Sequence, residues 1–385
     1  MLILLIIIAI ALAVFYGIVN LTDLPGIVKF LLVFIEMLAV SQIMIRRYKF
    51  SSEMGLVLIK SKEGIKIIEN IADKYGKIFD LLADVGVTIS YGLLSLFVMK
   101  KNTSPVSIIA GLILVMFLAW VVGPTASSFL IQMIKMGTVD KTALSLGGNA
   151  WLAFAIISGI LLIGGLFLFV VAGIVFYGGI IFSALASTIF FGTNAISHTA
   201  PGGTFILPGV NLPLFEGIIA LMVVLIVHEG THAILTRRAR VPLLSSGIVL
   251  FGIIPVGAFV EPDERRLMRV EQMKQTRVLV GGATANMLTS IFAFVLFLAI
   301  AVAYQNLTNG SSEPVPQPLK FIMVSLGLTF ALNFIVGTVN LLPLPLFDGF
   351  RLLDINVKNK TVVNALMYIT LFFFALNFLP WLFKV

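Results

Sequence analysis

The chain has 385 residues, of which 59% are hydrophobic and only 11% charged, with a net charge of +8. Soluble domains are nearer half apolar and a quarter charged, so this composition excludes an ordinary soluble protein. Cytoplasmic loops of membrane proteins collect Lys and Arg, which explains the positive charge without a nucleic-acid partner. The chain has no cysteine, so any metal must be held by His, Asp, Glu or water.

Apolar segments of about 20 residues, the length that crosses a bilayer as a helix, dominate the first half of the chain. The first two lie near 1–20 and 26–45, and the second ends in Arg46-Arg47, a cytoplasmic marker. The first has no positive n-region, so we expect a retained span and not a signal peptide. Residues 51–83 are more polar, and their apolar positions lie three and four apart, which predicts a cytoplasmic helix. We expect it to pack on the protein's own surface; docking of a partner is the alternative.

Further spans are predicted at 84–99 and 106–134. The segment 150–192 is apolar for too long to be one ordinary crossing, and a break near Gly164-Gly165 or Gly178-Gly179 would divide it. However, Arg46-Arg47 and the basic residues after 236 are both expected in the cytoplasm, so an even number of crossings must lie between them. With the three spans 84–99, 106–134 and 216–236, the segment 150–192 should cross once, or cross and re-enter. The sequence leaves this region open.

The second half of the chain has a clearer topology. The span 216–236 is followed by 237–277, a polar stretch with eight basic residues that is expected in the cytoplasm. Spans at 278–304, 320–342 and 361–381 complete the chain.

The span 216–236 contains the sequence His228-Glu229-Gly230-Thr231-His232, with two of the three histidines of the chain. Positions four apart share one helix face, so both imidazoles can reach a single zinc ion. Glu229 stands beside the first histidine, where it can accept a proton from water. Ionisable groups inside a span cost at least roughly 2.5–3.5 kcal/mol each, which favours a functional site. A polar cluster that holds helices together is the alternative.

Asp348 is the best candidate for a third metal ligand. Pro343 and Pro345 interrupt the end of span 320–342, and the predicted topology brings Asp348 to the same side of the bilayer as His232. The alternative is that Asp348 only caps a turn before Gly349. His198 lies in a loop predicted on the far side, where an ordinary loop histidine is expected.

The combination of His228 to His232, Gly281 to Asn286 at the start of a span, and Asn340-x-x-Pro-x-Pro-x-x-Asp348-Gly resembles the site-2 protease family. The resemblance covers roughly residues 205–350. Phe347, Phe350 and Gly281-Gly282 depart from the usual pattern of the family, but none of them removes a ligand or the base.

This resemblance implies an intramembrane zinc metalloendopeptidase that cleaves membrane proteins within or next to their transmembrane segments. It implies Zn²⁺ bound by His228, His232 and Asp348, with Glu229 as general base and proton donor. Asn340 matches an asparagine that holds substrate or stabilises an oxyanion. Asn286 matches a second motif asparagine and is a candidate for the same substrate-binding or oxyanion role, with a hydrogen bond between helices as an equal alternative.

The stretch 247–260 is β-branched and punctuated by glycine, unlike the spans. In similar proteins this region forms a membrane-associated β-hairpin or a re-entrant loop. Such an edge can pair with an unwound substrate by strand addition, or it can only shield the site from lipid. The additional N-terminal spans and the segment 207–213 resemble the archaeal and animal-like branch, which has no PDZ domain.

The sequence therefore predicts an all-α polytopic membrane protein with about 8–10 transmembrane helices and a small β-hairpin near the active site. We expect an N-terminal transmembrane region at 1–192, a catalytic core at 193–350 and a C-terminal helix at 351–385. The site is expected inside the bilayer, nearer the cytoplasmic face, with a transmembrane protein as substrate. A non-proteolytic zinc-binding membrane protein or a metal transporter is the alternative, although the outer halves of 216–236 and 320–342 are largely apolar.

Overall fold

A computed structural model describes the chain with the following residues left out: 1, 22–23, 25, 54, 62, 99–103, 138–149, 205, 207, 210, 309–314 and 384–385. The structure is 78% helical and includes a small four-stranded sheet, as expected of an all-α membrane protein with a β-hairpin. Part of the segment 207–213, which carried the branch prediction, lies outside the described residues.

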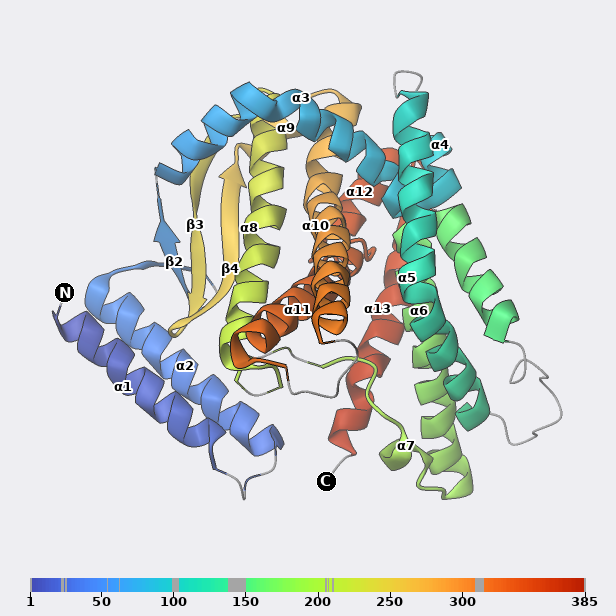
Figure 1. Cartoon of the computed structure of the whole chain (residues 1–385), viewed down its shortest axis with the longest axis horizontal. Helices are drawn as coiled ribbons and strands as arrows, with labels where there is room; N and C mark the ends of the chain where they lie inside the picture. The colour runs from blue at the N-terminus through green and yellow to red at the C-terminus, as the bar shows by residue number, and fades with distance from the viewer. Residues whose placement is uncertain are drawn as a thin grey trace. The chain divides into compact units, whose positions relative to one another are not determined.

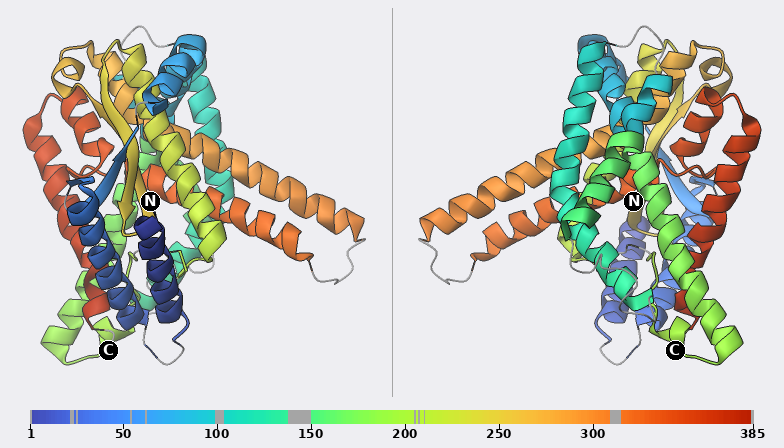
Figure 2. Two further views of the ribbon diagram at one scale, coloured as in Figure 1. Left: turned by 90° about the vertical axis from the view of Figure 1, so that its left-hand side faces the viewer. Right: turned by 90° about the vertical axis from the view of Figure 1, so that its right-hand side faces the viewer.

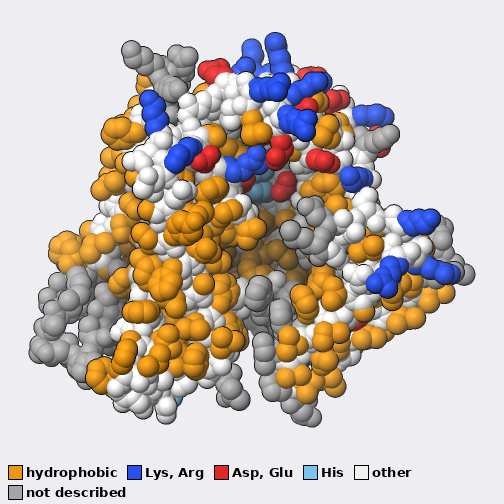
Figure 3. All heavy atoms as spheres, turned by 180° about the vertical axis from the view of Figure 1, so that it is seen from behind, with side chains coloured by type: hydrophobic (Ala, Val, Ile, Leu, Met, Phe, Trp, Pro, Cys, Tyr) orange, Lys and Arg blue, Asp and Glu red, His pale blue; other side chains and the backbone are white. Residues whose placement is uncertain are grey.

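Seven helices of the described part are long and apolar enough to cross a membrane. Hydrophobic side chains cover much of the face in Figure 3, while Lys, Arg, Asp and Glu gather mainly in a separate zone. The long helices are α3 (Glu63–Tyr91), α5 (Pro105–Gly137), α6 (Ala150–Phe191), α8 (Leu214–Arg238), α10 (Gln272–Leu307), α11 (Gln317–Val339) and α13 (Lys360–Phe378).

The chain forms two compact units, each assembled from segments that are far apart in the sequence. The first contains Met1–Gly76, Ile206–Arg269 and Ala285–Phe334. The second contains Lys77–Phe205, Val270–Thr284 and Ile335–Val385. The three-part division drawn from the sequence stays a prediction.

The sheet of the first unit is antiparallel, with the strands in the order β1 (Ser51–Glu53), β2 (Leu56–Lys60), β3 (Leu243–Phe251) and β4 (Ile254–Pro262). The β3–β4 hairpin confirms the interpretation of 247–260. The sequence did not predict that β2 would pair with β3, because residues 51–62 were assigned to the polar helical stretch. Figure 1 shows β4 next to α8, against which it packs.

Helices α1 (Leu2–Val19) and α2 (Gly26–Tyr48) form a hairpin that holds the turn between β3 and β4. Gly252 in this turn has a φ of 62° and donates its N–H to the Ser41 hydroxyl at 2.7 Å. A Cβ at Gly252 would lie 2.5 Å from the sulfur of Met37, so the turn can approach α2 only with glycine at this position. The two N-terminal helices thereby fix one end of the sheet.

Helix α6 of the second unit is kinked at Gly165, where φ is 61° and ψ is −158°. This is one of the two glycine pairs at which the sequence predicted a break. The other pair remains helical, and Gly178 packs against Phe373 of α13. The cytoplasmic helix expected within 51–83 and the span expected from residue 84 are joined in one helix, since α3 is continuous from Glu63 to Tyr91.

A buried ion pair joins α3 to the start of α10. Arg277 donates from Nε and Nη2 to the two carboxylate oxygens of Asp84, both at 2.7 Å. The side chains are only 26% and 9% exposed, so this is a desolvated bidentate pair. Two positions further along α3, a Cβ on Gly86 would collide with Thr284 of α10, which shows how closely the two helices pack.

We expect Asp84→Ala to lower the free energy of unfolding by about 3–5 kcal/mol, because it leaves the Arg277 guanidinium buried without its partner. The double variant D84L/R277M removes both charges and is expected to be less destabilised than the single variant. Thermal unfolding of the purified chain in detergent measures both effects. A double variant less stable than D84A would contradict this account of the pair.

Candidate metal centre

The two motif histidines face each other on α8. The Nε2 atoms of His228 and His232 are 3.1 Å apart, and the ring centroids are 4.7 Å apart at an interplanar angle of 73°. His228 is 7% exposed and His232 is half-buried. The helical spacing of four residues therefore turns both Nε2 atoms toward one point.

This geometry fits a shared metal ion. Two nitrogens that bind one tetrahedral zinc at about 2.0–2.1 Å lie roughly 3.4 Å apart. The observed Nε2–Nε2 distance of 3.1 Å is close to this value. The imidazoles thus have the separation of two ligands of the same ion.

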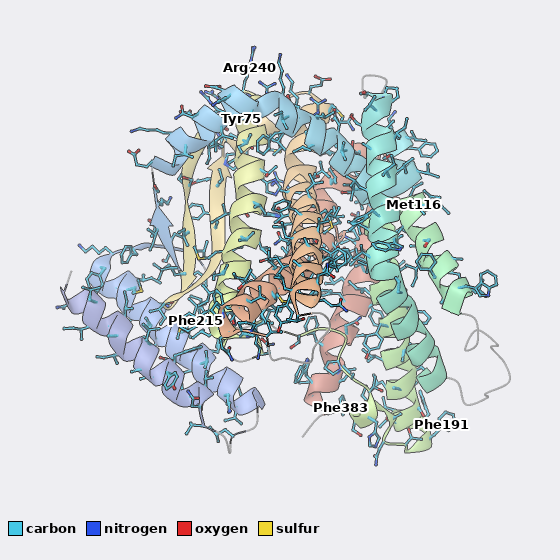
Figure 4. The ribbon with its side chains drawn as sticks, viewed as in Figure 1. Tyr75, Met116, Phe191, Phe215, Arg240 and Phe383 are labelled. Atoms are coloured by element: carbon cyan, nitrogen blue, oxygen red, sulfur yellow. The ribbon has the colours of Figure 1, made fainter. Side chains whose placement is uncertain are left out.

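The end of α8 that follows the motif is held by α3. Arg237 forms an ion pair with Glu69 at 3.3 Å, and Gly76 allows α3 to approach the side chain of Arg238. Figure 4 shows Arg240 and Tyr75 at this end of the first unit and Phe215 at the opposite end of α8. The motif therefore lies in the half of the helix that ends in basic residues.

Asn286 of α10 contacts the other ring nitrogen of His228. Its side-chain Nδ2 lies 3.1 Å from His228 Nδ1, and Asn286 is fully buried. The sequence singled out Asn286 as a residue of a span motif but did not predict this contact. A polar residue in an apolar span was the available signal, and its partner could not be read from the sequence.

Asp348 is the first residue of α12 (Asp348–Asn356), which follows a short non-helical segment. The helix cap is Phe347, with no side-chain capping bond, so Asp348 is not the N-cap residue. The N–H of Gly349 donates to the carbonyl of Asn340 at 2.8 Å, and this bond closes the segment that Pro343 and Pro345 interrupt. The predicted break in the helix before Asp348 is confirmed.

The side chain of Asn340 points back to its own helix. Its Nδ2 donates to the carbonyl of Val336 at 3.0 Å, while its backbone carbonyl receives the Gly349 bond. Asn340 thus fixes both ends of the segment that precedes Asp348. Its role toward a substrate stays a prediction.

His228, His232 and Asp348 form a group that could hold a metal ion. Two neutral imidazoles and one carboxylate are a donor set typical of a catalytic zinc site. His198 is not part of this group; it is exposed at the end of α7 (Ala195–His198).

Comparison with known proteins agrees with the motif. Residues 216–377 match the model of peptidase family M50, the site-2 protease family. The matched segment contains His228, Glu229, His232 and Asp348. This match is to a family of membrane metallopeptidases, which are hydrolases of peptide bonds. Together with the apolar helices, it indicates an integral membrane protein.

An uncharacterized protein of Methanocaldococcus jannaschii is 35% identical to this chain over 83 residues. The alignment covers 21% of this chain and 22% of that protein, so the chain matches less than a quarter of its relative. No solved structure matches the chain significantly. The M50 assignment therefore comes from the family model alone.

We expect Gly349→Ala to destabilise the chain by about 1–3 kcal/mol, because a Cβ would collide with the carbonyls of Leu341 and Leu342. Gly327→Ala is the matched control, since a Cβ at Gly327 of α11 meets no heavy atom within 4 Å. Alanine is the better helix former, so this control is expected to be neutral or slightly stabilising. Thermal unfolding in detergent compares the two variants, and equal effects would contradict the close packing at Gly349.

Proposed function

We propose that this protein is an intramembrane zinc metalloendopeptidase that cleaves peptide bonds within or next to transmembrane segments. The observation that carries the proposal is the facing pair of Nε2 atoms at 3.1 Å on an apolar helix of the M50 segment. Lipid offers no stabilisation to such groups, so a pair of imidazoles at this position favours a functional site over helix packing.

In this proposal the zinc ion is held by His228, His232 and Asp348. The chemistry of these side chains supports the proposal. The chain lacks cysteine, so nitrogen and oxygen ligands are the ones it can supply. Three protein ligands leave a fourth position open, as in catalytic zinc sites, whereas structural sites are closed by four. When bound, zinc supplies Lewis-acid chemistry that polarises a carbonyl and acidifies water.

Glu229 is proposed to be the general base. It follows His228 on α8, is half-buried, and is not part of the group that could hold a metal ion. In the proposed reaction it accepts a proton from the attacking water and then delivers that proton to the leaving amine. The departing amine is neutralised as the peptide bond breaks.

The proposed depth of the site follows from the length of α8. At about 1.5 Å per residue, His228 lies about 21 Å from Leu214 and about 15 Å from Arg238. Basic residues mark cytoplasmic ends, which supports a site inside the bilayer and nearer the cytoplasmic face. A substrate must therefore enter laterally as a transmembrane segment and be locally unwound.

The edge of β4 that does not pair with β3 is proposed to bind that unwound segment. β4 ends the described sheet and packs against α8, while β2 occupies the other side of β3. A strand paired with β4 would have its backbone extended, as a protease requires, and its hydrogen bonds satisfied by the sheet. Shielding from lipid is the alternative role of the hairpin.

Replacement of the base is the first test. We expect Glu229→Gln to abolish cleavage of a detergent-solubilised transmembrane substrate and to retain zinc, since Gln cannot accept the proton and Glu229 is not a proposed ligand. Stripping wild type with a chelator is expected to abolish cleavage, and added zinc to restore it. Product formation and bound zinc are measured on the same samples.

His198→Ala is the matched control for His228→Ala and His232→Ala, because His198 is an exposed histidine outside the metal group. We expect the control to keep both zinc and cleavage and the other two variants to lose both. Cleavage by E229Q would contradict the assignment of the base. A wild type that binds zinc and cuts none of a panel of transmembrane substrates would favour a zinc-holding non-enzyme or a metal transporter.

Cysteine crosslinking tests the proposed edge, because the natural chain offers no competing thiol. In the E229Q background, Ala258→Cys of β4 is expected to form a disulfide with a single cysteine placed near the cleavage position of a substrate. Ser52→Cys of β1, at the opposite edge of the sheet, is the control. Non-reducing gels measure the product, and equal crosslinking at both positions would contradict substrate binding at β4.

A further inference from the structure

The amide of Asn286 has one partner among the described residues, and that partner is a proposed ligand. Nδ2 lies 3.1 Å from His228 Nδ1, and Oδ1 is buried without a hydrogen-bond partner. A buried amide oxygen without a partner costs roughly 1–3 kcal/mol. The orientation of this amide is therefore tied to the protonation of the imidazole beside it.

Metal binding decides which ring nitrogen carries the proton. The Nε2 atoms of His228 and His232 face each other, so Nε2 is the atom that each ring offers to a metal ion. A neutral imidazole that binds through Nε2 carries its proton on Nδ1 and needs an acceptor there. When the side-chain amide of Asn286 is flipped by 180°, Oδ1 takes the place of Nδ2 and becomes that acceptor.

We propose that Asn286 is a positioning residue for the metal centre, which accepts a hydrogen bond from His228 Nδ1–H through Oδ1. This inference rests on the proposed function and deepens it. The bond selects the tautomer of His228 with a free Nε2 and fixes the plane of the ring. Partners of this kind commonly determine the orientation and basicity of ligating histidines.

The surroundings of Asn286 allow such a role. One turn further along α10, Ser290 donates to the carbonyl of Phe330 at 3.1 Å, and the rings of Phe294 and Phe330 are 5.0 Å apart. Figure 2 shows this part of α10 and α11 side by side. Met287 is 1% exposed and Ser290 is fully buried. The helix face that presents Asn286 is thus buried and packed against α11.

A second buried asparagine provides a control that distinguishes this role from polar packing between helices. Asn333 of α11 is also fully buried, and its Oδ1 is likewise without a partner in the described part of the chain. Its Nδ2 donates to Thr329 of its own helix at 2.8 Å and not to a histidine. Asn333 therefore matches Asn286 in residue type and burial but not in contact with a ligand.

The test measures zinc affinity of the full-length chain in detergent by competition with a chromophoric chelator. We expect Asn286→Leu to weaken zinc binding 10–100-fold, the range observed when such partners are removed. Asn286→Asp, which retains an acceptor oxygen, is expected to bind zinc at least as tightly as wild type, and Asn333→Leu to bind it within threefold. The visible absorption of bound Co²⁺ is expected to change in N286L and not in N333L.

Wild-type affinity in N286L would overturn the inference, as would an equal loss in N333L or in N286D. If N286L does not yield folded protein, Asn286→Ser removes the amide with a smaller side chain and is expected to show the same loss. Wild type that binds no zinc would overturn both this inference and the proposed metal centre. Wild type that binds zinc while N286L is unchanged would overturn only the role of Asn286.

Discussion

The interaction on which the rest of the structure depends is the approach of two imidazoles on one face of an apolar helix. In the proposed site these rings lie inside the bilayer, where water cannot stabilise them, so their polar atoms must face one another, a metal ion or another protein group. Both ring nitrogens of His228 have such a neighbour, since Nε2 faces His232 and Nδ1 faces Asn286. Helix α10 therefore contributes to the site, because it carries Asn286 on the far side of the His228 ring.

The elements around α8 limit its movement. The α1–α2 hairpin holds the turn of the β3–β4 hairpin, β4 packs against α8, and α3 crosses the end of α8 at Arg237. In the second unit the Asp84–Arg277 pair joins α3 to the start of α10. Helices α3 and α10 are each divided between the two units. The part of α3 up to Gly76 and the part of α10 from Ala285 belong to the first unit, and the remaining parts belong to the second.

Local patterns in the sequence predicted most of the spans, the histidine pair and the break before Asp348. These features depend on neighbours in the chain: an apolar run, a spacing of four residues, and prolines that cannot continue a helix. The pairing of β2 with β3 was not predicted, because the partners are about 190 residues apart and β2 is only five residues long. The partner of Asn286 was missed for the same reason, since no local pattern shows which helix an amide in a span will face. The sequence did not predict that one helix continues through residue 84. The sequence becomes more apolar there because this part of α3 is buried, and not because a turn begins a new helix.

The pairing of the β1–β2 hairpin with β3 also determines which strand edges of the sheet are left without a partner strand. An unpaired strand edge is a template for strands of other chains, and proteins commonly cover such edges. Here β1 and β2 extend the sheet from the β3 side and end it in a strand of only three residues, Ser51–Glu53. Such a short strand offers few backbone groups for pairing, whereas β4 has nine residues and packs against α8. The β1–β2 hairpin thus covers the edge of β3 that does not pair with β4, an edge that would otherwise be open to strands of other chains.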